Sequence, residues 1–483
     1  MHRTMLFVAL LAPLIALAQG PTPESRLKLQ EAVAAFKAGD IQKALAGAEA
    51  VYKETPDDLS AMTWYGYLLL QANRAKDAIE PLSRAVERDP ENAELRSNLG
   101  NAYLYSNAVD KALEEYKKAV ALDAKHADAW YNLGNTYMRL KDYPNAVPAL
   151  RKAAELRPQD PHCLNNLGFA LQHTGDTSGA IQQYRKASDL SPKSPVFAAN
   201  AGVLLAQQAQ WQDAATYLAR AALQDPNDYN VRVTLGQCYA KLGKRQEAAE
   251  QYRAAATLRP QEPVPHYNLG YLYQEEKNWV QAAAAYERAL ELRHDDLDAL
   301  GNYGVVLFRL QRFRDSAAAF ERLLGLNPNS IDARINLAAA KKQMGDRKGA
   351  IELWKEVVRR EPQRVDVRMA LANALYAEGL LEDAGYHYRQ VLLAKPTSAG
   401  AHNGLGLIAY RNNDMDGAMK HLQEAVRLDP RFADAHNNLG VVLERLGKRK
   451  EAEDAYKKAL ALRPNYPEAA ENLKRIREAS GSR

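Results

Sequence analysis

Asparagine recurs in this chain at a spacing of 34 residues. Its side-chain amide donates and accepts hydrogen bonds, so a row of asparagines can hold the backbone of an extended peptide without selecting its side chains. Asparagine is also a mediocre helix former, so eight of them at one helical position require a reason. The row runs through Asn98, Asn132, Asn166, Asn200, Asn268, Asn302 and Asn336, is broken within this run only at Thr234, and recurs at Asn438. We expect these amides either to contact a bound segment or to tie one helix to its neighbour.

Aromatic side chains fall on the same helical side as the asparagines when the chain is placed on a helical wheel. Tyr131 and Tyr267 directly precede asparagines of the row, and Tyr271 follows Asn268 by three residues. Further aromatic residues on this side are Tyr67, Phe169, Phe308, Tyr376 and Tyr410. Because tyrosine is enriched among residues that dominate binding energies, we expect Tyr131, Tyr267, Tyr271, Tyr67 and Phe169 to anchor a ligand, whereas Phe308, Tyr376 and Tyr410 can pack at a junction between repeats. Packing at a junction between repeats is the alternative.

Catalytic and metal-binding patterns are poorly represented. Gly404–Ala409 imitates a dinucleotide-binding fingerprint, but it lies within a helical pattern and follows no strand. His402 and His436 are one repeat apart, as are His387 and His421, and no cysteine or carboxylate completes a metal-ligand spacing. The sequence also contains no G-x-S-x-G, P-loop or H-E-x-x-H motif. We therefore expect no catalytic residue, no metal site and no cofactor, and a protein that is not an enzyme.

The elements that position these residues follow a strict period. Stepping by 34 residues from Pro56 to Pro464 lands on proline at all but two stations, Ala124 and His294. This register defines thirteen contiguous repeats, from Ser25–Asp58 to Ala433–Tyr466. A fixed period of this size is typical of stacked repeats, in which each unit needs its neighbours to bury its apolar face. We number the positions of each repeat from 1 to 34, so that the asparagine row occupies position 6.

Each repeat contains the pattern of two helices. Position 8 is glycine in ten repeats and alanine in three, which predicts that a second helix approaches closely there, because glycine inside a helix costs about 1 kcal/mol relative to alanine. Position 15, between the helices, is often glycine or asparagine and predicts a left-handed helix end. Aspartates follow it in five repeats and are expected to cap the second helix: Asp40, Asp142, Asp176, Asp346 and Asp414. Positions 2, 5, 6, 9, 12 and 13 lie opposite the buried arc of the first helix.

The repeats closely resemble the tetratricopeptide repeat family. Its pattern W-x2-L-G-x2-Y…A-x3-F…P is nearly complete in one repeat, as Trp130, Leu133, Gly134, Tyr137, Ala146, Leu150 and Pro158. The resemblance implies an all-α fold, a right-handed α-solenoid superhelix of thirteen helix pairs, with first helices lining a concave groove that binds peptides. The position-6 row is similar to that of the O-GlcNAc transferase repeats, although no catalytic region follows them. The basic residues that the family's carboxylate clamp needs at positions 5 and 6 are absent.

The segments before and after the repeats differ from them in sequence pattern. Residues 1–18 have the charged, apolar and small-residue regions of a signal peptide, followed by a flexible segment at 19–24. Residues 467–483 are expected to form a capping helix and a frayed tail. No later stretch is apolar for about 18 residues, so we expect no membrane span in the mature chain. Cys163 and Cys238 lie two repeats apart, too far for a disulfide, and are expected to be buried thiols.

These observations favour a non-enzymatic scaffold that binds an extended peptide or protein segment in its concave groove. The alternative is a structural assembly factor for an envelope or secretion complex that acts through its convex surface. A net charge of +5 spread over 483 residues is not the footprint of a nucleic-acid-binding protein. The leader predicts an exported protein, periplasmic or extracellular, in a bacterium. The partner, the pathway and the oligomeric state stay open.

Overall fold

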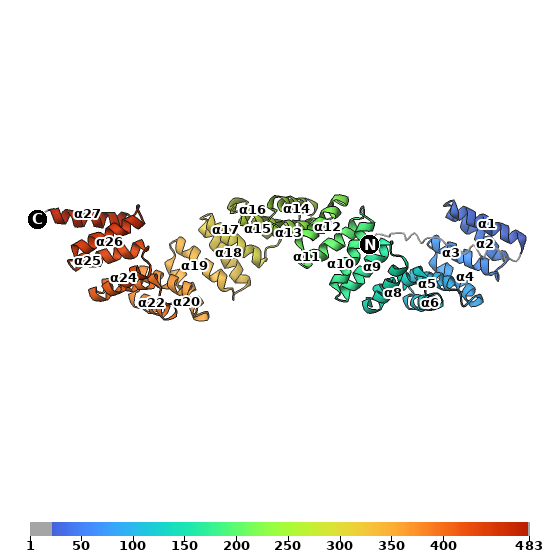
Figure 1. Ribbon diagram of the computed structural model, residues 1–483, viewed down its shortest axis with the longest axis horizontal. Helices are drawn as coiled ribbons and strands as arrows, with labels where there is room; N and C mark the ends of the chain where they lie inside the picture. Colours follow the sequence, from blue (N-terminus) through green and yellow to red (C-terminus); the bar gives the residue numbers. More distant parts are fainter. Residues whose placement is uncertain (1–21, 482–483) are drawn as a thin grey trace. The chain divides into compact units, whose positions relative to one another are not determined.

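The computed structural model describes residues 22–481 (Figure 1). The predicted signal peptide and residues 19–21 lie outside this range. The first helices of the repeats are α1(Pro23–Lys37), α3(Leu59–Gln71), α5(Ala93–Tyr105), α7(Ala127–Arg139), α9(Pro161–His173), α11(Pro195–Gln207), α13(Tyr229–Lys241), α15(Pro263–Glu275), α17(Leu297–Arg309), α19(Ile331–Gln343), α21(Val365–Ala377), α23(Ala399–Arg411) and α25(Ala433–Arg445). The second helices are α2(Ile41–Glu54), α4(Ala75–Arg88), α6(Val109–Leu122), α8(Tyr143–Leu156), α10(Thr177–Leu190), α12(Trp211–Gln224), α14(Arg245–Leu258), α16(Trp279–Leu292), α18(Phe313–Leu326), α20(Arg347–Arg360), α22(Leu381–Ala394), α24(Met415–Leu428) and α26(Arg449–Leu462). A final helix, α27(Pro467–Gly481), follows them.

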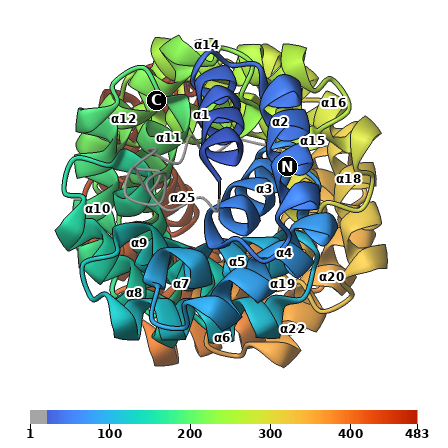
Figure 2. The same ribbon diagram turned by 90° about the vertical axis from the view of Figure 1, so that its right-hand side faces the viewer.

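This order confirms the predicted solenoid of helix pairs. From the second repeat onward the first helix covers positions 1 to 13 and the second helix positions 17 to 30. The chain forms two compact units, one up to Leu258 and one from Arg259. Within the first unit, Figure 2 shows α5, α9 and α11 on the inner side and α6, α10 and α12 on the outer side. In the second unit, α15 and α19 likewise lie inside α16 and α20.

The start of the first helix differs from the expected flexible segment at 19–24. Thr22 caps α1, because its hydroxyl accepts a hydrogen bond from the backbone N–H of Ser25 at 3.1 Å. Pro23 and Glu24 form the first turn, where proline loses no needed donor and a carboxylate favours the positive end of the helix dipole. Residues 23 and 24 therefore belong to the helix, and Thr22 is its cap.

Glycine at position 8 allows the two helices of a repeat to approach closely, as predicted. A Cβ atom on Gly270 would lie 2.7 Å from the ring of Tyr286, and one on Gly134 would lie 2.5 Å from the side chain of Leu150. These larger residues occupy position 24 of the second helix and are fully buried. The close approach places the ring or leucine of one helix directly against the backbone of the other.

The turn between the paired helices contains a left-handed residue in every repeat. Position 15 has positive φ even where it is neither glycine nor asparagine, as at Lys141, Ala209, Lys277 and Gln311. The five aspartates that follow position 15 all cap the second helix, for example through Asp176 Oδ1 and the N–H of Gly179 at 2.8 Å. Both features of the turn confirm the prediction.

Replacing Ala209 with glycine should stabilise the protein by about 1 kcal/mol. Ala209 has a φ of 56°, a backbone conformation that costs a residue with a Cβ atom about 1–2 kcal/mol. Glycine avoids this cost, but it loses more conformational entropy on folding than alanine, which cancels part of the gain in stability. The urea midpoint of the purified protein would report the gain. Gly175→Ala, at the same position with a φ of 88°, is the matched control and should lower the midpoint. Equal stability of both variants and the parent would contradict the strain argument.

Both cysteines are buried free thiols. Burial raises the pKa of the Cys238 thiol to about 11 and raises that of Cys163 further, which keeps both in the unreactive protonated form.

At the C-terminal end, α27 packs on the last repeat through Ala469, Leu473 and Ile476. Across residues 22–481, helices long and apolar enough to cross a membrane are absent.

Candidate peptide-binding face

The inner face is defined here by positions 2, 5, 6, 9, 12 and 13 of the first helices. In the first unit, its position-6 amides bond to the preceding first helix. The Nδ2 atom of Asn132 donates to Asn101 at 3.0 Å, and that of Asn200 donates to Asn165 at 2.8 Å. Asn166 donates from Nδ2 to both the Tyr131 hydroxyl, at 3.0 Å, and Asn135 Oδ1, at 2.9 Å. The asparagines therefore tie neighbouring repeats together.

The second unit repeats this arrangement. Asn302 donates to the hydroxyl of Tyr267 at 3.2 Å, and Asn438 donates to Asn403 at 2.9 Å. The final helix α27 continues the row, since Asn472 donates to Asn437 at 3.1 Å. The acceptor lies either 35 residues earlier, at position 5, or 31 residues earlier, at position 9.

Three predicted asparagines differ from this pattern. Asn98 is buried and donates to Glu94 of its own helix at 3.3 Å. The Nδ2 atom of Asn268 is buried without a partner among the described residues, and position 5 of the preceding repeat is an apolar residue, Val233. Asn336 is half-buried, and within residues 22–481 its side chain has no hydrogen bond. The position-6 asparagines therefore differ in their hydrogen-bond partners.

The structure separates the three predicted tyrosines. Tyr131 is only 5% exposed, and burial raises its pKa to about 12, so this ring lies within the packed repeats. Tyr267 is half-buried and packs edge-on against Tyr286 with ring centroids 5.7 Å apart. Tyr271 is 50% exposed. Of the three, Tyr271 alone presents a large part of its ring to solvent, and Tyr131 is better described as a junction residue.

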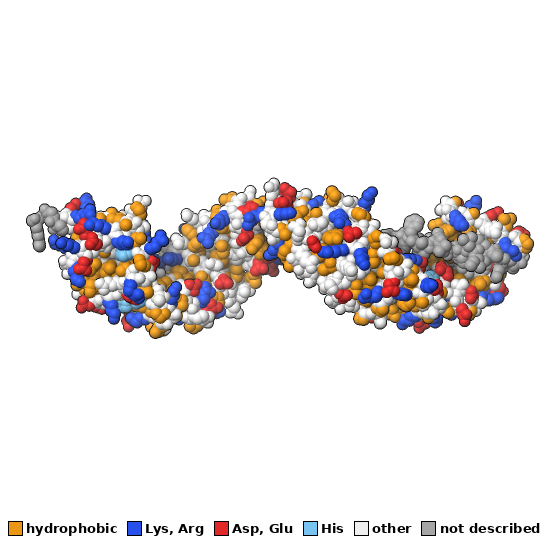
Figure 3. All heavy atoms as spheres, in the orientation of Figure 1, with side chains coloured by type: hydrophobic (Ala, Val, Ile, Leu, Met, Phe, Trp, Pro, Cys, Tyr) orange, Lys and Arg blue, Asp and Glu red, His pale blue; other side chains and the backbone are white. Residues whose placement is uncertain are grey.

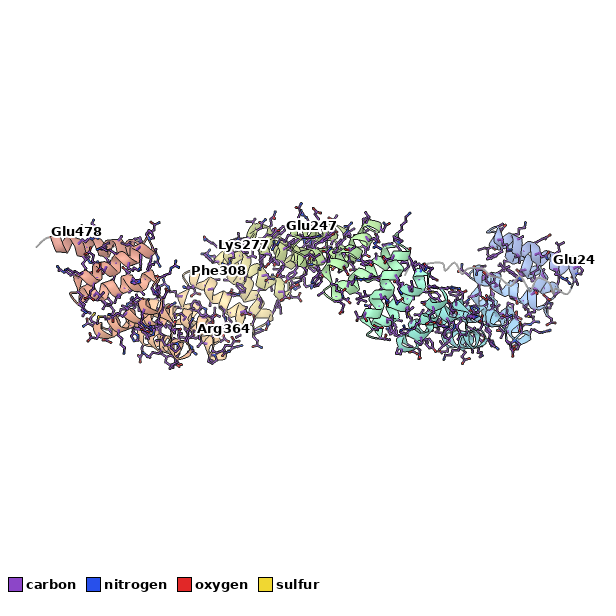
Figure 4. All side chains as sticks on the ribbon, viewed as in Figure 1. Glu24, Glu247, Lys277, Phe308, Arg364 and Glu478 are labelled. Carbon is purple, nitrogen blue, oxygen red and sulfur yellow. The ribbon has the colours of Figure 1, made fainter. Side chains whose placement is uncertain are left out.

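The other aromatic residues of this side also differ in exposure. Phe169 is 40% exposed and forms a cluster with His173 and with Tyr143, which stacks on His173 at 4.4 Å. Phe308, labelled in Figure 4 at the end of α17, is half-buried against Phe313 at 5.2 Å. Phe169 and Tyr271 are therefore the exposed rings at position 9. Each lies three residues after a position-6 asparagine, on the same helical side.

Sequence reasoning missed the acceptors at positions 5 and 9: Asn101, Asn135, Asn165, Asn403 and Asn437. A search for polar pairs 31 or 35 residues apart would have found them. The Nδ2 atoms of the position-6 asparagines donate to these acceptors, so their donor capacity is used inside the protein. Within residues 22–481, no donor reaches Oδ1 of Asn132, Asn200 or Asn302. The two explanations offered for the row are therefore compatible, because the amide donor serves packing and the carbonyl oxygen stays available.

Asn166→Ala should destabilise the first unit by about 1–3 kcal/mol. Asn166 donates two hydrogen bonds and accepts one from Asn165 at 3.3 Å, so its loss leaves several half-buried groups unpaired. Asn336→Ala is the matched control at the same repeat position and should be neutral or slightly stabilising, because alanine favours helix. Urea unfolding followed by circular dichroism measures both. A cost for Asn336→Ala as large as that for Asn166→Ala would show that the bonds do not decide stability.

Positions 4 and 23 face each other across the helix pair. They hold the ion pair of Arg96 with Glu115 at 2.8 Å and the hydrogen bond of Arg232 to Gln251 at 2.7 Å. In repeat 12 they hold His402 and His421, whose Nδ1 atoms are 3.1 Å apart. The sequence analysis paired histidines one repeat apart and did not predict the contact between His402 and His421. At this distance the rings can share one proton, whereas two protonated rings repel each other.

The second unit should lose stability as the pH falls from 7.5 to 5. Burial, followed by the charges of His402 and Lys420, lowers the pKa of His421 below its ordinary value of 6.5. A lowered folded-state pKa means that folding favours the neutral ring, so stability is present above the unfolded pKa and is lost as acid protonates it. Urea midpoints at the two pH values measure the loss. The double variant His402→Arg/His421→Gln, which copies the pair in repeat 7, should reduce the pH dependence; an unchanged dependence would exclude the histidine pair as its source.

Models of the tetratricopeptide repeat match residues 267–331, 307–373, 387–431 and 403–467. The model of the Cilia and flagella-associated protein 70 C-terminal domain matches residues 14–267. No curated protein matches the chain.

Similar solved structures cover different shares of the chain. YrrB, described as a TPR protein with an unusual peptide-binding site, is 25% identical over 38% of this chain and 95% of its own, with a TM-score of 0.36. Cut9–Hcn1, an APC/C hetero-tetramer, is 14% identical over 94% and 96%, with a TM-score of 0.38. Yeast Tom70 is 17% identical over 87% and 95%, with a TM-score of 0.34.

Proposed function

Because the chain belongs to the tetratricopeptide repeat family, whose members generally mediate protein–protein interactions, we propose that it is a non-enzymatic scaffold that binds an extended polypeptide segment along its inner face. One observation carries this proposal. In both units an exposed ring at position 9, Phe169 or Tyr271, lies one helical turn after a position-6 amide. An aromatic anchor beside a hydrogen-bonding group is the combination that dominates many protein interfaces.

A second candidate function uses the outer surface. Leu223 on α12 and Leu393 on α22 are 75% and 76% exposed, and Tyr386, also on α22, is 52% exposed. Tyr386 and Leu393 lie seven residues apart on one side of α22, and this exposed apolar pair favours the alternative of an assembly factor that joins other subunits through this surface. On the face shown in Figure 3, acidic and basic side chains are interspersed.

Site-specific crosslinking distinguishes the two functions. A photo-reactive residue at Tyr271 tests the inner face, and one at Tyr386, which has nearly the same exposure, tests the outer surface. Expression in the native host is followed by mass spectrometry of the captured proteins. A single dominant partner captured from Tyr271 and not from Tyr386 supports binding at the inner face. Capture from Tyr386 alone transfers the function to the outer surface.

The proposed location is the periplasm or the exterior of a bacterial cell, and it depends on the leader at residues 1–18. N-terminal sequencing of the protein recovered from the periplasmic or culture fraction tests this. A mature chain that begins at Gln19 is expected, whereas an intact Met1 in the cytoplasmic fraction would contradict export.

A further inference from the structure

Repeat 12 places two histidines face to face between its paired helices. His402 lies on α23 and His421 on α24, and their Nδ1 atoms are 3.1 Å apart. Both residues are half-buried, so the pair is partly accessible to solvent. In repeat 3 the same two positions, 4 and 23, hold the oppositely charged Arg96 and Glu115. Repeat 12 therefore replaces an ion pair with two side chains that can each offer a nitrogen lone pair.

The distance between these two nitrogens suits a shared metal ion. Imidazole nitrogens bind zinc at about 2.0–2.1 Å. Two nitrogens 3.1 Å apart would therefore form an angle of about 100° at an ion bound to both, which is close to the angle of a tetrahedral site. In the neutral tautomer with its proton on Nε2, each ring keeps the Nδ1 lone pair free to bind. The histidine pair thus supplies two ligands at nearly the separation that one ion requires.

A carboxylate at position 26 of the same repeat can provide a third ligand. In repeat 10 the side chains at positions 4 and 26 meet, with Arg334 Nε 3.0 Å from Glu356 Oε2. Repeat 12 has Glu424 at position 26, and its carboxylate now accepts hydrogen bonds from the exposed Arg427. An exposed ion pair of this kind contributes little to stability, so the carboxylate can turn toward His402 at small cost. Within residues 22–481, three such ligands do not already surround one point, and this rotation is what the site requires.

We propose that His402, His421 and Glu424 form a binding site for a divalent transition-metal ion, and that Zn²⁺ is the ion their ligand set fits. Two imidazole nitrogens and one carboxylate oxygen are ligands that zinc accepts, and water can complete its coordination on the accessible side. The bound ion would join the two helices of repeat 12 and stabilise them, because it binds only the folded arrangement. Positions 4, 23 and 26 are not part of the inner face, so this site is independent of the proposed function.

Titration calorimetry with zinc tests the site on the full chain, purified without a histidine tag and freed of metal with a chelator. The parent protein should bind one zinc ion per chain at this site. His421→Gln and Glu424→Gln should each weaken binding by at least about tenfold, since losing even a group that only supports a metal ligand costs about 10–100-fold. His436→Gln is the matched control and should leave binding unchanged, because this half-buried histidine occupies position 4 of repeat 13, where position 23 is Ala455.

Stability provides a second measurement. Zinc should raise the urea midpoint of the parent protein, whereas magnesium, which prefers six oxygen ligands, should not. Circular dichroism verifies that the variants fold, and His402→Gln repeats the test if His421→Gln does not.

The possible outcomes separate the assignments. Absence of zinc binding by the parent protein overturns the proposal and means that the two histidines share a proton only. Zinc binding that survives both His421→Gln and His402→Gln places the ion elsewhere and equally overturns it. Binding that is lost in the histidine variants and unchanged in Glu424→Gln overturns the assignment of the carboxylate ligand.

Discussion

Gly304→Ala should destabilise the second unit by about 1–3 kcal/mol, whereas Gly301→Ala, one helical turn earlier on α17, should stabilise it by about 0.5–1 kcal/mol. A Cβ atom on Gly304 would lie 2.7 Å from the ring of Phe320, which is 1% exposed and has little room to move. The nearest atom to a Cβ on Gly301 is a methyl group of Leu323 at 3.5 Å, an ordinary contact. The same substitution therefore has opposite effects on one helix.

The repeats that carry alanine at position 8 explain why this cost is not universal. In repeat 11, Ala372 accompanies Tyr388, whose ring lies against Gly404 of the next repeat, where a Cβ would approach it to 2.4 Å. In repeat 1, Ala32 faces Gly47, where a Cβ would lie 3.1 Å away. In these two of the three alanine-bearing repeats, a glycine elsewhere supplies the space that position 8 lacks. Repeat 9 has Gly304 opposite Phe320, and alanine there has no such compensation within its own helix pair.

Urea unfolding monitored by circular dichroism measures both variants. Repeat proteins can unfold in more than one step, so the midpoint of the transition lowered by Gly304→Ala should be compared with the corresponding transition of the parent protein. Equal stability of Gly304→Ala and the parent would mean that Phe320 moves aside without cost. A loss of stability in Gly301→Ala would contradict the claim that the position is open.

The 34-residue period made the helix pairs and their turns predictable, because each boundary is set by local chemistry that recurs. The left-handed position 15 illustrates the limit of residue type alone. Ala209 and Gln311 adopt the same conformation as glycine there, since packing of the two helices requires the turn and outweighs the local strain. Neither residue would have been selected from its type.

The candidate site was less predictable, since its contacts join residues from different helices. The role of Asn166 depends on Tyr131 and Asn135 in the preceding repeat, and Asn336 at the same position has no such partners. Tyr131 and Tyr267 share position 5, yet the first is buried and the second is half-buried. The contact of His402 with His421 spans two helices. Helical position predicts the side of a helix, but the neighbouring repeat decides what a side chain contacts.

Tyr271→Ala should weaken binding of the segment captured at the inner face by about 2 kcal/mol, or about 30-fold. Half of the Tyr271 side chain is exposed, so a partner can bury it and gain both apolar contact and a hydrogen bond to the hydroxyl. Phe169→Ala should have a similar effect in the first unit, although its contact with His173 makes a small loss of stability expected as well.

Titration calorimetry with a synthetic peptide of the captured segment measures these losses. Tyr386→Ala is the matched control, because its ring is exposed to nearly the same extent on a second helix and should leave the affinity unchanged. The unfolding midpoint of Tyr271→Ala should stay close to that of the parent, so that a change in affinity reflects lost contact with the partner. Unchanged binding by both Tyr271→Ala and Phe169→Ala, together with a loss in Tyr386→Ala, would place the partner on the second helices. The exposed ring beside a position-6 amide would then be a feature of the repeat surface without a role in recognition.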